Sequence, residues 1–163
     1  MTAIQPESLV GGGVRSLEVR WIFTGQLPAA VAGWFGRFPA ETRVVEDAYL
    51  LDPYLPGLSV KVRGRRALEV KVYCGSPGLL QVAGRARGRL ESWQKWSFPC
   101  DEPSQGGGDP AGWSLVSKRR RISWFSLAGG PARPRVPGPD GEAGCAVELT
   151  EIRTGGETWW TLG

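Results

Sequence analysis

The segment at residues 57–75, GLSVKVRGRRALEVKVYCG, alternates apolar and charged side chains with a period of two. Successive side chains of a β-strand point to opposite faces, so this alternation predicts a β-hairpin with one aliphatic and one charged face. The aliphatic positions are Leu58, Val60, Val62, Leu68, Val70 and Val72. The residues alone leave two interpretations open: a charged face in water, or a charged face turned inward around an anionic ligand.

Twenty-four Gly and 13 Pro among 163 residues are unsuited to a helical bundle and favour short strands joined by turns. We expect a mainly β, α+β fold: an antiparallel barrel, or tunnel, of about eight strands, closed or nearly closed so that few edges are exposed. The expected strands are 16–23, 42–51, the two strands of 57–75, 89–98, 113–127, 145–153 and 157–163. The expected loops are 75–88, 99–112 and 129–144.

A short helix is expected after the first strand, because Leu27, Val31, Trp34 and Phe38 recur at helical spacing. Residues 1–13 read as a flexible tail, and residues 14–163 as a single domain.

The composition excludes several kinds of site. The chain has no His, which rules out a His base or His-ligated zinc. Its three Cys, at 74, 100 and 145, form no CxxC pair, so we expect neither a disulfide framework nor a thiolate metal site, and a reducing cytoplasm is the expected location. We expect no signal peptide, because the first 16 residues contain no basic segment followed by an apolar core, and no apolar run in the sequence approaches transmembrane length. The net charge of +4 favours an anionic small molecule as partner.

The period of two also places charged residues on shared faces. These pairs are Glu18 with Arg20, Lys61 with Arg63, Glu69 with Lys71, and Arg119 with Arg121. Lys118 and Arg120 should then face the other way and be exposed. The run SKRRR at 117–121 is a candidate nucleic-acid patch, but a charged edge strand that resists aggregation is the preferred interpretation, so nucleic acid is an unlikely partner.

The motifs EVRWI at 18–22, KVR at 61–63, VKV around Lys71, KRRR at 118–121 and VELTEI at 147–152 occur in an order that resembles the CYTH superfamily. These triphosphate tunnel proteins include class IV adenylate cyclases, thiamine triphosphatases and inorganic triphosphatases. The resemblance implies a tunnel whose inward basic residues grip a triphosphate or polyphosphate, and acidic residues that hold Mg²⁺ or Mn²⁺. It would turn the charged face of the hairpin inward.

Carried onto this chain, the resemblance implies three sets of residues. The ligand-binding set is Arg20, Lys61, Arg63, Lys71, Arg119 and Arg121. The catalytic set is Glu18, Glu69 and Glu148, of which Glu18 and Glu148 would hold the metal. Glu91 is a further candidate carboxylate. The alternative for all these carboxylates is ion pairing with neighbouring cations.

The chain departs from the family pattern on its first strand, where Arg20 and Ile22 replace a carboxylate and a lysine. A guanidinium beside Glu18 would repel a metal. We therefore expect anion binding that needs little metal, with weak hydrolysis at most. The other class of function left open is a lipocalin-like barrel that carries a hydrophobic ligand.

Overall fold

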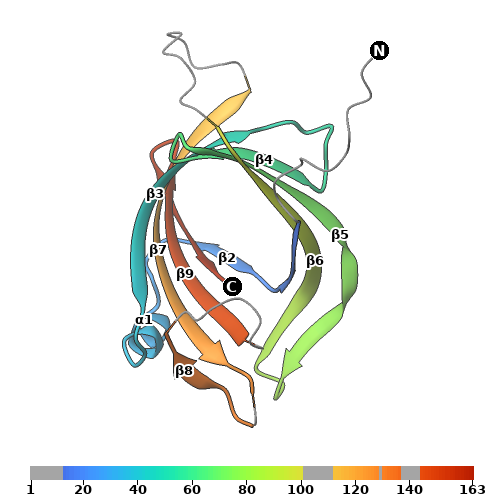
Figure 1. Cartoon of the computed structure of the whole chain (residues 1–163). Coiled ribbons are helices and arrows are strands. Elements are labelled where there is room, and N and C mark those ends of the chain that lie inside the picture. The colour runs from blue at the N-terminus through green and yellow to red at the C-terminus, as the bar shows by residue number, and fades with distance from the viewer. Residues whose placement is uncertain (1–12, 101–111, 129, 137–143) are drawn as a thin grey trace. The chain divides into compact units, whose positions relative to one another are not determined.

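A computed structural model describes residues 13–100, 112–128, 130–136 and 144–163. Their contacts divide into two compact units. The first holds the described residues up to 19 and those of 47–115, and the second holds those of 20–46 and 116–163. Ten strands pair into an antiparallel sheet, and a single short helix follows the second strand of the described chain (Figure 1). The mainly β prediction, with a helix near the start, is confirmed.

The strands of the first unit pair in the order β1-β6-β5-β4-β3. Their bounds are β1 Val14–Glu18, β3 Glu41–Leu50, β4 Leu58–Arg63, β5 Ala67–Val82 and β6 Ala86–Pro99. Only the end of β3 belongs to this unit, together with the start of β7, Trp113–Ser126. The predicted hairpin is confirmed as β4 and β5, with Lys61 directly opposite Glu69.

The second unit contains the rest of β3 and β7, and its strands pair in the order β7-β9-β10-β2. Its other elements are β2 Trp21–Thr24, α1 Ala29–Phe35, β8 Arg133–Arg135, β9 Gly144–Thr154 and β10 Glu157–Leu162, with β8 paired to β7. The final hairpin predicted around Gly155 and Gly156 is confirmed; both glycines adopt the positive φ that a tight turn requires.

The prediction of one first strand at 16–23 was wrong. The segment is split at Val19 and Arg20 into β1, which pairs with β6, and β2, which pairs with β10. This split, together with β8, raises the count from the expected eight strands to ten. The prediction of a closed barrel is also corrected, since the pairing of the described strands begins at β1 and ends at β2 without a ladder between these two.

The predicted loop at 75–88 is instead the distal part of the β5–β6 hairpin. Sequence reasoning missed it because Gly and Pro interrupt the alternation. In the structure these residues form an irregularity in the register between Tyr73 and Gly78, after which pairing resumes. Likewise, β8 lies within the Pro- and Gly-rich stretch that was expected to be a loop, whereas the excursion at 99–112 falls mostly outside the described residues.

The best-buried apolar side chains belong to the second unit, where α1 packs on the sheet. The Phe38 ring lies 5.2 Å from that of Phe125 on β7, and the Trp34 ring 6.2 Å from it. Phe35 and Leu149 are almost completely buried. No helix in the described part of the chain is long and apolar enough to span a membrane.

Leu149→Ala should therefore reduce the free energy of unfolding by about 2–5 kcal/mol, because it removes a fully enclosed side chain and leaves a cavity. Leu17→Ala is the matched control: Leu17 is 60% exposed, and its loss should cost no more than about 0.5 kcal/mol. Urea denaturation of both variants measures the difference. Equal losses would contradict this assignment of the core.

Candidate functional site

One face of the first unit gathers charged side chains from five neighbouring strands. Residues directly opposite each other in an antiparallel pair share a face, so the register fixes its membership. We call it the charged face: Glu18 on β1, Asp47 on β3, Lys61 and Arg63 on β4, Glu69 and Lys71 on β5, and Glu91 and Lys95 on β6. These eight residues are four carboxylates and four cations, and Arg87 and Arg89 continue the same face of β6 toward the tip of its hairpin.

Asp47, Lys61, Arg63 and Glu69 form an ion-pair network across β3, β4 and β5. Lys61 Nζ lies 3.0 Å from Asp47 Oδ2 and 3.2 Å from Glu69 Oε2. Arg63 Nη1 lies 2.9 Å from Glu69 Oε1, and its Nε lies 3.6 Å from Asp47 Oδ1. Because each cation touches both carboxylates, the network is neutral without any ligand.

Burial distinguishes the two faces of the hairpin. The Asp47 side chain is fully buried, that of Glu69 is 7% exposed and that of Lys61 is 12% exposed. On the aliphatic face, Val60 and Val62 are only half-buried. The interpretation in which this charged face lies in water therefore does not fit these residues.

A second cluster lies on β1, β5 and β6. Lys71 donates to both oxygens of Glu18 at 2.7 Å, and its Nζ lies 4.8 Å from the centre of the Trp93 ring. Trp93 in turn donates its indole N–H to Glu91. Glu18 is thus paired with Lys71.

Lys95 is the cation that stands apart in this cluster. It lies directly opposite Lys71 and is half-buried. Among the residues that the structure describes, Lys95 makes no hydrogen bond or ion pair. Two lysines therefore lie directly opposite each other in the ladder. The carboxylate of Glu18 is paired with Lys71 and not with Lys95.

In the second unit, Glu148 on β9 is held by the side chains of Arg120 and Thr150. Burial alone would raise the pKa of Glu148. The hydrogen bonds from Arg120 and Thr150, with the charges of Arg120 and Arg20, outweigh burial and hold this pKa below its ordinary value. Arg120, expected to be merely exposed, is half-buried and bound to a carboxylate, so that expectation was wrong.

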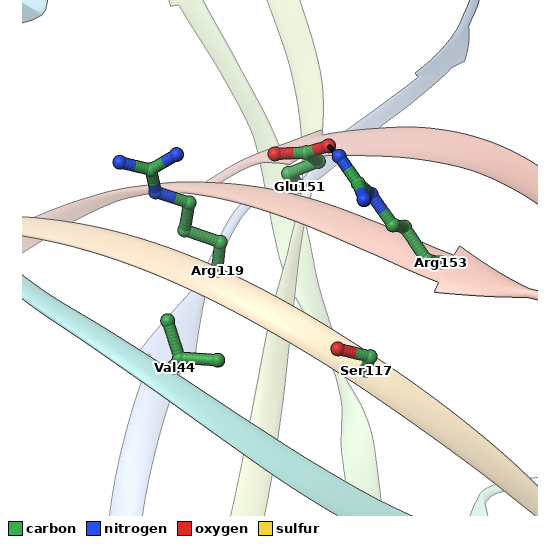
Figure 2. A pocket seen from close by; sticks show the side chains of 5 residues that line it. All are labelled: Val44, Ser117, Arg119, Glu151 and Arg153. Carbon is green, nitrogen blue, oxygen red and sulfur yellow. Dashed lines mark hydrogen bonds and ion pairs between the residues drawn. The ribbon is translucent and has the colours of Figure 1, made fainter.

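Arg119 and Arg121 lie on the face of β7 opposite to that of Arg120. Arg119 lines a shallow pocket of about 190 Å³ in the second unit, and Figure 2 shows its guanidinium beside the Glu151–Arg153 pair. Val44 and Ser117 complete this lining. Arg121 instead contacts α1: its Nη2 lies 3.4 Å from the Phe35 carbonyl, and its guanidinium packs 5.8 Å from the Phe35 ring.

The structure thus brings together only part of the predicted site. The members it collects on the charged face of the first unit are Glu18, Lys61, Arg63, Glu69 and Lys71. Arg20, Arg119, Arg121 and Glu148 belong to the second unit. Sequence reasoning missed Asp47 and Lys95. Each lies two positions from an aromatic residue of its own strand, Tyr49 for Asp47 and Trp93 for Lys95, and so shares a face with it.

The predicted metal ligands do not fit a divalent cation in this arrangement. Lys71 occupies both oxygens of Glu18, and Arg120 occupies both oxygens of Glu148. A metal would have to compete with these cations for its hard oxygen ligands. The described residues also contain no group of three or more Asp, Glu, Cys or His side chains that could hold a metal ion.

In comparisons with known proteins, no family model and no curated protein matches the chain.

Lys61→Met should destabilise the fold by about 3–5 kcal/mol, because it leaves the buried carboxylates of Asp47 and Glu69 without their shared cation. Arg153→Met is the control, since the Arg153 side chain is 70% exposed and its pair with Glu151 should contribute no more than about 1 kcal/mol. Urea denaturation at neutral pH compares the two. A loss below 1 kcal/mol in Lys61→Met would show that the network is dispensable.

The ionisation of Glu148 should make the free energy of unfolding depend on pH in the acid range. Because its folded pKa lies below the ordinary value of 4.5, the ionised form is favoured by folding, and this stabilisation is complete above pH 4.5 and is lost as the pH falls through the folded pKa. Glu148→Gln should therefore be less stable than the natural chain at neutral pH, and the gap should shrink below pH 4.5. Denaturation curves at a series of pH values test this; a gap that stays constant would count against it.

Proposed function

We propose that the chain binds a phosphate-bearing anion, of the triphosphate or polyphosphate class, at the charged face of the first unit. The observation that carries the proposal is the placement of Lys95 directly opposite Lys71. Like charges directly opposite in a ladder destabilise a sheet. An anion between the two ammonium groups would remove this repulsion and give Lys95 a partner.

The chemistry of the two lysines suits a phosphate. An ammonium group is a compact point charge with three donors, and its hydrogen bonds to phosphate oxygens are charge-assisted. A ligand with several phosphates could contact both lysines and extend along the face. The resemblance to the triphosphate tunnel proteins favours the same class of ligand.

Lys61 and Arg63 take a different role in the proposal from the one that their sequence motif implies. Both are already neutralised by Asp47 and Glu69, so a ligand would gain little from them without breaking those pairs. We assign them to the scaffold that holds β4 and β5 in register beside the lysines. Binding rather than rapid hydrolysis is proposed, because Glu18 is committed to Lys71.

A hydrophobic ligand, as in a lipocalin-like barrel, is less well supported. Such a ligand needs an enclosed apolar surface. In the first unit the most buried side chains of β3, β4 and β5 are the acidic ones of Asp47 and Glu69. A hydrophobic ligand placed there would exclude water from these side chains and offer them no hydrogen bonds in its place, which is unfavourable.

Lys95→Ala should weaken tripolyphosphate binding by about 1.5–3 kcal/mol, roughly 10- to 150-fold, as for a lost hydrogen bond to a charged group. The same change should leave the ligand-free protein as stable as before or stabilise it by up to about 1 kcal/mol, since it removes the repulsion from Lys71. Titration calorimetry at fixed ionic strength measures the first effect, and urea denaturation without phosphate measures the second.

Arg43→Ala is the control for net charge, because Arg43 is an exposed residue of the second unit. It should leave tripolyphosphate affinity unchanged. Titrations with and without Mg²⁺ or Mn²⁺ should give similar affinities for the natural chain. Equal affinity in Lys95→Ala and the natural protein would refute the assignment of this face.

A further inference from the structure

The distal part of the β5–β6 hairpin, residues 78–90, carries three arginines within five residues. Arg85, Arg87 and Arg89 are all exposed. From residue 75 to residue 90 the sequence contains no Asp or Glu. We call this segment the basic hairpin. It is not needed for the function proposed above, which uses other residues of β5 and β6.

The geometry of the basic hairpin presents its arginines in a row. Arg87 and Arg89 alternate on β6, so their side chains leave the same face about 6.7 Å apart, and Arg85 follows the turn. The turn itself is small: Ala83 and Gly84 both have positive φ, and the Arg85 amide donates to the Val82 carbonyl at 2.8 Å. No bulky side chain at this tip keeps the ribbon away from a surface.

We propose that the basic hairpin binds the phosphate backbone of double-stranded nucleic acid. A two-stranded β-ribbon fits the major groove of B-form DNA, and arginine forms bidentate hydrogen bonds with phosphate. Contacts of this type are independent of sequence and are driven by the release of counterions. The row of arginines supplies about three such contacts.

Two other anionic partners fit the basic hairpin less well. Binding to single-stranded nucleic acid relies on aromatic side chains for base stacking, and residues 74–92 contain none. A membrane-inserting ribbon needs one continuous apolar face. Here the exposed apolar residues Leu79 and Val82 differ by an odd number of positions and point to opposite faces.

The run SKRRR, which the sequence first suggested as a nucleic-acid patch, is a weaker candidate in the structure. Arg120 is bound to Glu148, and Arg121 contacts α1 from the other face of β7. Its cations are therefore divided between two faces, whereas the basic hairpin keeps its positive charge on one short ribbon.

The test is fluorescence anisotropy with a labelled 20-base-pair DNA duplex and an RNA duplex of the same sequence, between about 50 and 200 mM salt. With three phosphate contacts, the slope of log K against log salt should be about −2.7 for the DNA duplex, which is roughly a 40-fold loss of affinity over this range. Arg85→Ala/Arg87→Ala/Arg89→Ala should abolish most of this slope. The corresponding triple Lys variant should keep most of it and shows that the ribbon still folds.

The control removes the same charge elsewhere: Arg37→Ala/Arg43→Ala/Arg133→Ala, all exposed residues of the second unit. It should retain the affinity of the natural chain for the duplex. Equal losses in the two triple Ala variants would mean that only net charge matters and would overturn the proposal. So would hairpin-dependent binding to phosphatidylserine vesicles without binding to either duplex.

The two sites are distinguishable in the same variants. The triple hairpin variant should bind tripolyphosphate normally, because Lys71 and Lys95 are unchanged. Lys95→Ala should bind the duplex normally. A duplex signal that disappears in Lys95→Ala and persists in the hairpin variant would place nucleic-acid binding at the charged face and overturn the inference.

Discussion

Lys61 lies between two carboxylates, Asp47 and Glu69, in the most enclosed part of the first unit. A buried charge is costly unless partners compensate it. Each partner here comes from a different strand, so the compensation exists only when β3, β4 and β5 pair in one register. A slip of one residue would move Lys61 to the opposite face, beside valines, and leave both carboxylates uncompensated. The network therefore selects the register more than it adds stability.

The same constraint separates scaffold from candidate site. Lys61 and Arg63 are paired with the carboxylates of Asp47 and Glu69. In the cluster on β1, β5 and β6, by contrast, the cations and carboxylates do not all pair with one another. Lys95 lies opposite another lysine, and among the described residues the Glu91 side chain is bound by the Trp93 indole alone. A group of side chains whose charges balance in total can still attract an anion at the point where those charges are unevenly distributed. This is why the proposed ligand position differs from the motif that first suggested it.

The sequence predicted what depends on local patterns. Strict alternation identified the hairpin at 57–75, and the spacing of Val31 and Trp34 identified the helix. It could not show that one alternating segment pairs with two different strands, which divides it at Val19 and Arg20. Nor could it foresee that pairing resumes beyond the irregularity between Tyr73 and Gly78.

Assignment of the candidate site was limited for a related reason. Alternation says which residues of one strand share a face, but not which face receives the partners. Arg120 was therefore expected to be exposed, whereas it is paired with Glu148. Asp47 was overlooked because a lone carboxylate in a strand of acidic and aromatic residues matches no motif. Only the pairing register revealed that Asp47 lies opposite Arg63.

The division of the first segment has a consequence for synthesis. Trp21 on β2 pairs with Leu162 on β10, and Val14 on β1 pairs with Lys95 on β6. During translation, β2 must wait about 140 residues for its partner strand, a delay of roughly 7–28 s at about 5–20 residues per second. Throughout that interval an amphipathic segment with unpaired backbone edges is available to other chains. Strand β2 is therefore among the last of the described strands to be protected, although it is made before most of them.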